Sequence, residues 1–434
     1  MIDAFLGFFL LLPISVAAIS VFLILEFKNA SKTAKINGTV LIALGIFAAA
    51  SAGELHSILN GFERSRIFLV MFFAVSWLQT PARKSQALNR VRQTISLQPP
   101  GRRYLMTASG VHGLGAVLNL AGLSLIASIV KKTQGIELKR RFIMALMIGF
   151  TSGSCWSPFY LSVVVVLVAV PTINLLDVAP LGVGIAVTSM LVGWGYDRLR
   201  FGSSKRLDAS KATPLMLFEW THVLGILGSL AGLIFFIIYF MEITIPIALG
   251  LITPIYSIIW WLSMHKVNSN FSQTVIRLTE HVVSSFGSLR NEALVFVAAT
   301  VFGAGVSSVI PEAVVAEFVS KYLPLIVSRI ACLTFSVLLL GMMGVHPVVT
   351  VIFIGEFLSP GILGVEDWVM GLSLLSVWGL STMVNPYSAT TLYLARTTKV
   401  SPFLIAWRWN IPVCLLATSV STSIIVLLWH FYNR

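Results

Sequence analysis

The segment Thr151-Ser-Gly-Ser-Cys-Trp-Ser-Pro158 is a polar interruption, with a glycine and a proline, of an apolar run from Phe142 to Val170. A helix that crosses lipid must bond its backbone N–H and C=O groups within the protein. Such an interruption is therefore tolerated only where it faces protein or a water-filled cavity. A second interruption, Ser381-Thr-Met-Val-Asn-Pro-Tyr-Ser388, occurs in the second half, and Pro158 aligns with Pro386. The sequence predicts two broken membrane helices in corresponding positions.

A second pair of matching segments lies upstream of the two interruptions. The first reads Ser109-Gly-Val-His-Gly113 and the second reads Met343-Gly-Val-His-Pro347. Duplicated halves with discontinuous helices are typical of secondary transporters, whose binding site lies near the middle of the bilayer. We therefore expect these four segments to surround a solute-binding site.

The composition is that of a polytopic membrane protein. Of 434 residues, 57% are hydrophobic and only 11% are charged, whereas soluble domains carry roughly 25% charged residues. Apolar stretches of about 20 residues, enough to cross a bilayer, recur along the chain. The first of them, from Ala4 to Leu25, has neither a basic start nor a cleavage site, which indicates a retained span and not a signal peptide.

The net charge of +13 does not indicate nucleic-acid binding. Most basic residues fall in short loops that the layout places on one membrane side, as the positive-inside rule requires, and no nucleic-acid-binding motif is present. The stretch 104–130 has basic clusters at both ends, which favours a re-entrant hairpin with its tip near Gly110–Gly113 over a single crossing.

These patterns predict an all-α membrane protein built as an inverted repeat, with about ten transmembrane helices, two of them broken, and two re-entrant helical hairpins. The first repeat, 1–197, has three spans, a cytoplasmic-side hairpin at 104–130, a broken helix at 142–170 and a span at 181–196. A cytoplasmic linker covers 198–214. The second repeat, 215–434, has three spans, an outer-side hairpin at 322–359, a broken helix at 368–394 and a last span at 407–429.

This arrangement of tips and breaks resembles the ion-transporter superfamily, which includes divalent-anion/sodium symporters, citrate carriers and arsenite-permease-like proteins. The resemblance implies that substrate and sodium bind where hairpin tips and helix breaks meet, that an elevator-type motion carries them across, and that the protein is a homodimer. Sodium-coupled dicarboxylate members carry Ser-Asn-Thr at these places. The tips here read Ser109-Gly-Val111 and Gly344-Val-His346, so the resemblance concerns the architecture and not a named substrate.

Small hydroxyl residues beside a helix break have a physical use. The N-terminus of a half-helix carries about half a positive charge and favours an anion, while unwound carbonyls and hydroxyl oxygens can coordinate sodium. The predicted substrate-binding residues are Gly110, His112, Ser152, Ser154, Ser157, Gly344, His346, Ser381, Thr382, Asn385 and Ser388. The predicted sodium ligands are Ser152, Ser154, Thr382 and Asn385. In the alternative interpretation, these side chains only bond backbone groups freed at the proline kinks.

His112 and His346 occupy equivalent positions at the two predicted tips. A histidine within the membrane can bind substrate oxygens or titrate with a transported proton. Alternatively, each ring simply hydrogen-bonds its hairpin turn. The neighbouring glycines permit a tight turn, and Asn119 lies within reach of the first tip.

Three carboxylates, Glu54, Glu219 and Glu356, are candidates for coupling, because acidic groups within a membrane are costly. Glu54 and Glu219 equally fit solvated helix ends, and Glu356 could pair with Arg329 across the second hairpin. The chain has no metal-ligand spacing, no nucleophile-plus-base arrangement and no phosphate-binding loop. We therefore expect no enzyme activity and no cofactor beyond a coupling ion.

The sequence thus predicts a secondary active transporter of a small, anionic solute, driven by a sodium or proton gradient. We expect it in the lipid bilayer of a bacterial cytoplasmic membrane, with most basic loops inside. Three alternatives stay open: a non-transporting assembly or scaffold subunit, an intramembrane enzyme that uses His112 and His346 on a lipid-linked substrate, and an exporter of amphiphiles or toxic oxyanions.

Overall fold

The computed structural model describes residues 11–96, 100–131, 133, 135–202, 217–264 and 271–432. All the regular elements in these ranges are helices, as the sequence predicts. The predicted linker lies outside the described residues from position 203 onward.

The chain divides into two compact units. Unit 1 contains residues 1–81, 232–322 and 348–363, and unit 2 contains residues 82–231, 323–347 and 364–434. Each unit thus combines segments from both predicted repeats. The helix α4 (Ser57–Lys84) begins in unit 1 and ends in unit 2, and α11 (Leu217–Met241) runs from unit 2 into unit 1.

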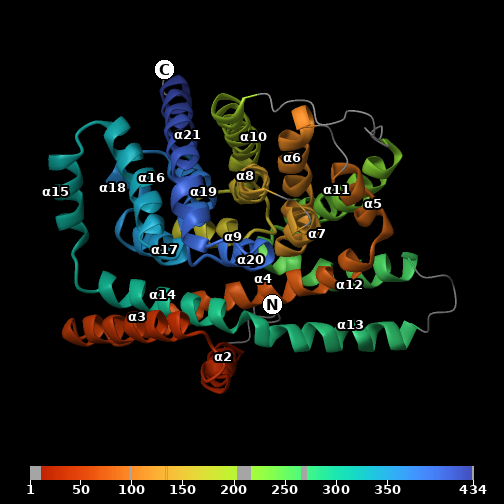
Figure 1. The fold of residues 1–434 in the computed structure, drawn as a ribbon. Coiled ribbons are helices and arrows are strands. Elements are labelled where there is room, and N and C mark those ends of the chain that lie inside the picture. Colours follow the sequence, from red (N-terminus) through yellow and green to blue (C-terminus); the bar gives the residue numbers. More distant parts are fainter. Residues whose placement is uncertain are drawn as a thin grey trace. The chain divides into compact units, whose positions relative to one another are not determined.

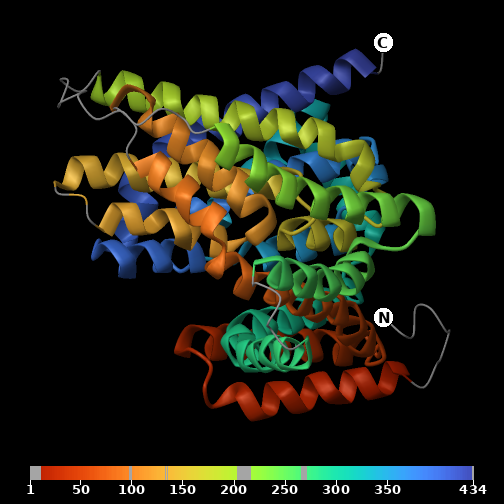
Figure 2. The same cartoon turned by 90° about the vertical axis from the view of Figure 1, so that its right-hand side faces the viewer.

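Unit 1 is organised around the close packing of α3 against α14 (Figure 2). A Cβ atom added to Gly45 would lie 2.7 Å from the Val301 carbonyl oxygen, so the two helix backbones almost touch. The α-helices that lie wholly within unit 1 are α2 (Leu11–Phe27), α3 (Lys32–Ser51), α12 (Ile245–Met264), α13 (Phe271–Phe286), α14 (Arg290–Ser307), α15 (Glu312–Tyr322) and α18 (Pro360–Leu363), while α17 (Pro347–Phe357) lies in it from Val348 on.

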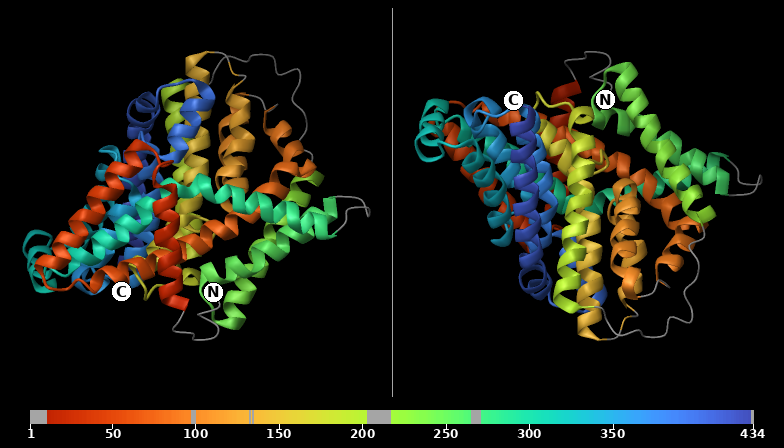
Figure 3. Two further views of the ribbon diagram at one scale, coloured as in Figure 1. Left: turned by 90° about the horizontal axis from the view of Figure 1, so that it is seen from below. Right: turned by 90° about the horizontal axis from the view of Figure 1, so that it is seen from above.

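Unit 2 is organised around α19 (Asp367–Val384), which is almost entirely buried. This helix packs against α8, α16 and α21 (Figure 1), and α10 lies beside α21 (Figure 3). The other helices of unit 2 are α5 (Gln86–Ser96), α6 (Pro100–Leu118), α7 (Leu120–Lys131), α8 (Ile136–Ser152), η1 (Gly153–Cys155), α9 (Leu161–Ala169), α10 (Leu175–Phe201), α16 (Ile326–Met342), α20 (Ala389–Thr398), η4 (Leu404–Asn410) and α21 (Ile411–Tyr432).

Both polar interruptions break their helices where the sequence predicts. Helix α8 ends at Ser152, a single 3₁₀ turn follows, and α9 begins at Leu161, so Pro158 lies in the irregular stretch. Helix α19 ends at Val384 and α20 begins at Ala389. Proline lacks a backbone N–H and cannot continue the helical bonding pattern, which explains the position of both breaks.

The first turn lies later than predicted. Helix α6 runs without interruption through Gly110–Gly113, and the chain reverses at Asn119, whose φ is 51°. Asparagine tolerates this left-handed conformation better than most residues. Gly122 then packs against the backbone of Leu114. The second turn lies where predicted, because α16 ends at Met342, Gly344 has a φ of 93° and α17 begins at Pro347.

Six helices in the described ranges are long and apolar enough to cross a membrane, or seven if the bent pair α14 and α15, which meet at 89°, forms one span. This number is smaller than the ten spans predicted. Length is the reason for part of the difference, since α8 and α9, the two parts of the first broken helix, each have fewer than 18 residues.

The contact between α6 and α8 provides a first prediction. A Cβ atom at Gly149 would overlap the Ala108 backbone, whereas one at Gly113 would meet nothing within 4 Å. We expect Gly149→Ala to lower the free energy of unfolding by about 1–3 kcal/mol through overpacking. Thermal or denaturant unfolding of the purified protein measures this.

Gly113→Ala is the matched control. It adds the same methyl group to a helix of the same pair, and we expect it to leave stability unchanged or to raise it by up to about 1 kcal/mol. Equal effects of the two substitutions would contradict the close approach of α6 and α8.

Candidate functional site

The first break packs against the helix that carries the second break. The Ser154 hydroxyl donates a hydrogen bond to the Leu375 carbonyl at 3.4 Å. A Cβ atom at Gly379 would overlap the Thr151 carbonyl oxygen and would lie 2.7 Å from Ser154 Oγ. The two broken helices therefore meet in unit 2, at a point of α19 that precedes its own break.

His112 is tied to the first break by a chain of hydrogen bonds. Its Nδ1 lies 2.9 Å from Ser152 Oγ and 3.2 Å from the Gly149 carbonyl. The Ser152 hydroxyl donates to the same carbonyl at 2.9 Å. On the other side of the ring, the Trp156 indole N–H donates to His112 Nε2 at 3.2 Å.

These contacts fix the tautomer of His112. Indole nitrogen is a donor only, so Nε2 must be the accepting, unprotonated nitrogen, and Nδ1 carries the hydrogen that faces Ser152. A doubly protonated ring would place two N–H groups opposite each other at Trp156. In this arrangement both ring nitrogens of His112 are hydrogen-bonded to side chains of the first break.

Each break also holds the turn that precedes it in the chain. At the first break, Ser157 Oγ donates to the Ala116 carbonyl, and Asn119 Nδ2 donates to the Phe159 carbonyl at 3.2 Å. Asn119 thus contributes both the turn and one of the bonds that hold it. The Asn119 amide, which the sequence places near the first tip, thus bonds a backbone carbonyl of the first break.

At the second break, the Asn385 side chain holds the preceding turn in the same way. Its Nδ2 donates to the Val345 carbonyl at 3.0 Å, and its Oδ1 accepts the Tyr387 N–H at 2.8 Å. A Cβ atom at Gly344 would lie 2.8 Å from the Tyr387 ring. His346 lies half-buried in the same turn. In both halves the asparagine bond joins residues 40 positions apart.

The remaining predicted hydroxyls also bond backbone groups. Ser381 Oγ donates to the Val337 carbonyl and Thr382 Oγ1 to the Trp378 carbonyl, both at 3.0 Å. Ser388 caps α20 by accepting the Thr391 N–H at 3.2 Å. A hydroxyl that donates to a carbonyl has no further proton to give but keeps oxygen lone pairs. Ser152, Ser154 and Ser157 are in the same situation.

A narrow crevice, with no room for a water molecule, lies between the first break, α10 and α19. Hydroxyl groups from three segments border it, namely Thr151 and Ser152, Ser189 of α10, and Ser376 of α19. Ser189 and Ser376 are not among the predicted site residues. Nothing distinguishes them in the sequence, because Ser189 is the one serine of the long apolar helix α10 and Ser376 is one of three serines in α19.

Two of the predicted coupling carboxylates, Glu54 and Glu356, belong to unit 1, whereas both breaks belong to unit 2. Glu54 is exposed and pairs with His56 at 3.1 Å, as expected for a solvated helix end. Glu356 pairs with Arg64 of α4, and Arg329 Nε donates to the Leu323 carbonyl at 2.7 Å. The pair of Glu356 with Arg329 stays a prediction. The Glu219 side chain lies outside the described part of the chain.

Asn410 is a buried polar residue that is not among the predicted site residues. It ends a π-helical segment, and its Nδ2 donates to the Ile405 carbonyl at 2.9 Å and faces Met147 Sδ at 3.1 Å. Its Oδ1 has no hydrogen-bond partner among the described residues. Pro412, which removes one helical N–H, is the sequence signal for this irregularity. In the described ranges, no group of three or more His, Cys, Asp and Glu side chains could hold a metal ion.

Comparison with known proteins identifies the fold. It is similar to that of the Alcanivorax borkumensis YdaH transporter, whose crystal structure is described as having an unusual topology. The TM-score is 0.60 at 12% sequence identity, and the match covers 92% of this chain and 98% of that chain. No protein-family model matches the chain, and no curated protein matches it in sequence. At this level of identity the likeness concerns the fold alone: over most of its length the chain has the helical architecture of that transporter.

The contact between His112 and Trp156 gives a second prediction. We expect Trp156→Phe and His112→Ala each to lower the free energy of unfolding. A double-mutant cycle should show a coupling energy of about 1 kcal/mol, because each substitution removes the same hydrogen bond.

Trp407 provides the control for this cycle. Its indole N–H donates to the Met342 carbonyl at 3.1 Å, so Trp407→Phe also removes an indole hydrogen bond in unit 2. We expect its effect to add to that of His112→Ala without coupling. Additive behaviour of the Trp156 pair as well would refute the network at the first break.

Proposed function

We propose that this transporter-like chain is a secondary active transporter of a small, anionic solute, coupled to a sodium gradient. The proposed site lies in unit 2, between the first break (Thr151–Pro158), the second break (Ser381–Ser388) and the turns that they hold. The observation that carries the proposal is the packing of the first break on α19, the helix that leads into the second break.

The orientation of the hydroxyl groups supports sodium as the coupling ion. Ser152, Ser154 and Thr382 donate their protons to backbone carbonyls, so their oxygens offer lone pairs only. Such oxygens suit a hard cation. Proton coupling through His112 is less favoured, because the Trp156 indole N–H faces its second ring nitrogen.

The helix starts after the two breaks support an anionic solute. Helices α9 and α20 begin directly after the interruptions, and unbonded N–H groups in a first helical turn favour negative charge. No lysine or arginine occurs in either break. A bound cation and the helix ends would therefore balance the charge of the solute.

The finer architecture belongs to the same proposal. We infer an inverted repeat with about ten spans and two re-entrant hairpins, an elevator-type motion, a homodimer and a bacterial cytoplasmic membrane with the basic loops inside. In this proposal the hydrogen bonds from Asn119 to the Phe159 carbonyl and from Asn385 to the Val345 carbonyl keep each turn and its break together during the motion.

Uptake by proteoliposomes tests the proposal. Dicarboxylates, sulfonates, oxyanions and amino acids are screened with an imposed sodium gradient, an imposed proton gradient or neither. We expect one anionic class to accumulate with sodium, and Ser154→Ala and Asn385→Ala to lower the initial rate by about tenfold or more, a loss of about 1.4 kcal/mol in binding or barrier energy.

Ser419→Ala is the matched control, because Ser419 is an exposed serine of α21 that also donates to a carbonyl of its own helix. It should transport normally. Normal transport by Ser154→Ala and Asn385→Ala would contradict the assignment of the breaks to the binding site. Accumulation driven by a proton gradient alone would contradict coupling to sodium.

A further inference from the structure

Asn410 lies beside the second break, although it belongs to the last helical region of the chain. Phe403 directly precedes the π-helical segment η4, and its ring meets the ring of Tyr387, with centroids 5.8 Å apart. One turn after Asn410, Cys414 Sγ lies 3.9 Å from Met383 Sδ. These two contacts are made on the two sides of the second break. The stretch that contains Asn410 therefore runs alongside that break.

Hydrogen bonds fix the orientation of the Asn410 amide. Its Nδ2 donates to the Ile405 carbonyl, which can only accept, and it also faces Met147 Sδ of the first broken helix. Both amide hydrogens are used in these contacts. The residue is fully buried, and its Oδ1 receives no hydrogen bond from any residue that the structure describes. Because buried amide oxygens normally accept a hydrogen bond or bind a cation, this oxygen indicates a ligand.

The end of α19 provides more oxygens of the same kind at the second break. In a continuous helix, the carbonyls of residues 382–384 would accept the N–H groups four positions later. Pro386 has no N–H to give. The Tyr387 N–H is bonded to Asn385 Oδ1 at 2.8 Å, and the Ser388 N–H to the Asn385 carbonyl at 3.3 Å. The break thus withholds the helical partners of all three carbonyls.

Charge favours a cation at this place. The C-terminus of a helix carries about half a negative charge, and α19 ends here at Val384. Backbone carbonyls at a broken helix end and amide oxygens are the ligands that sodium takes in transporters. The protein supplies no cationic side chain of its own, since residues 381–388 include no lysine or arginine and Arg408 of η4 is exposed.

We propose that Asn410 Oδ1 and the carbonyls at the end of α19 together bind the coupling sodium ion. This inference rests on the function proposed above and adds to it a ligand from outside the two breaks. π-Helical turns are rare and are frequent at functional sites, and η4 is the segment that brings Asn410 into this position. Through Met147, the same side chain also contacts the first broken helix.

The sodium dependence of thermal unfolding tests the proposal on the purified full-length protein without a solute. Sodium chloride replaces choline chloride at constant ionic strength. We expect the melting temperature of the unaltered protein to rise with sodium to a plateau, because a bound ion stabilises the folded state. In Asn410→Leu and Asn410→Ala, which lack the oxygen, the sodium concentration for half of this rise should increase about tenfold or more. Asn410→Asp keeps an oxygen and should stay within about threefold.

Thr422→Val is the matched control. Thr422 is a buried residue of α21 whose hydroxyl shares a hydrogen bond of 2.9 Å with Thr334 Oγ1. This variant should melt at a lower temperature but keep the same half-maximal sodium concentration.

The possible outcomes separate this proposal from the function on which it rests. An unchanged half-maximal concentration in Asn410→Leu and Asn410→Ala, or an equal loss in Asn410→Asp, would overturn the role of Asn410 and leave sodium coupling intact. If sodium did not stabilise the unaltered protein, both sodium coupling and this assignment would fail.

Discussion

The arrangement of breaks and turns in unit 2 depends on the need to hydrogen-bond every backbone N–H and C=O group inside the membrane. Two helices are broken by proline-containing segments, and each break frees N–H and C=O groups that lipid cannot satisfy. Two asparagines supply bonds to such groups: Asn119 Nδ2 donates to the Phe159 carbonyl, and Asn385 Oδ1 accepts the Tyr387 N–H. The same residues that make the breaks possible therefore also hold the turns against them.

This arrangement gives the polar side chains two roles at once. Ser152 and Ser154 donate to carbonyls and so stabilise the first break, but their oxygens can still accept. The structural and the functional interpretations of these serines are therefore compatible. Both ring nitrogens of His112 have partners in this arrangement, Ser152 on one side and Trp156 on the other.

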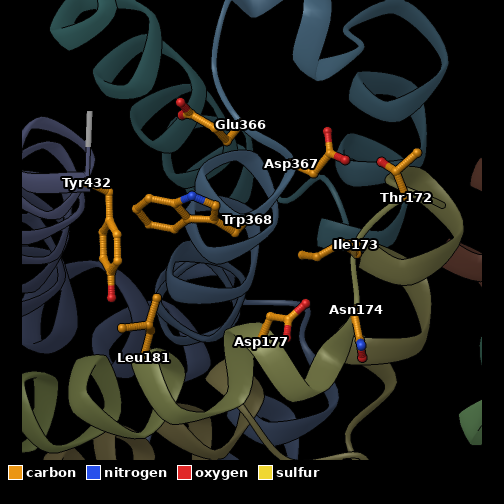
Figure 4. Close-up of a pocket in the computed structure, with 9 residues that line it drawn as sticks. All are labelled: Thr172, Ile173, Asn174, Asp177, Leu181, Glu366, Asp367, Trp368 and Tyr432. Atoms are coloured by element: carbon orange, nitrogen blue, oxygen red, sulfur yellow. The ribbon is translucent and has the colours of Figure 1, made fainter. Parts of the chain in front are cut away.

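The charges of unit 2 are distributed unequally between its ends. Arg141 and Asp197 form a buried pair at 2.7 Å that ties the start of α8 to the end of α10, and such a pair is costly to break. The opposite end of α10 contributes Asp177 to the lining of a cavity that also includes Glu366 and Asp367 (Figure 4). The last turn of α10 instead carries Arg198 and Arg200, so the two ends of this helix differ in charge.

The sequence alone determined the class of protein and the position of both breaks, because apolar length and proline act locally along one helix. It also located the turn at Gly344. It did not locate the turn at Asn119, since several residues of Gly110–Asn119 could end a helix and only the packing of α6 on α8 selects one of them. The tertiary structure decided which residue pairs with Glu356 and which serines border the crevice at the first break, namely Ser189 and Ser376. It also decided that Asp177, Glu366 and Asp367 line one cavity. Each depends on which helix faces which, and that is fixed by the close approach of glycines such as Gly149 and Gly379 to backbone atoms far away in the chain.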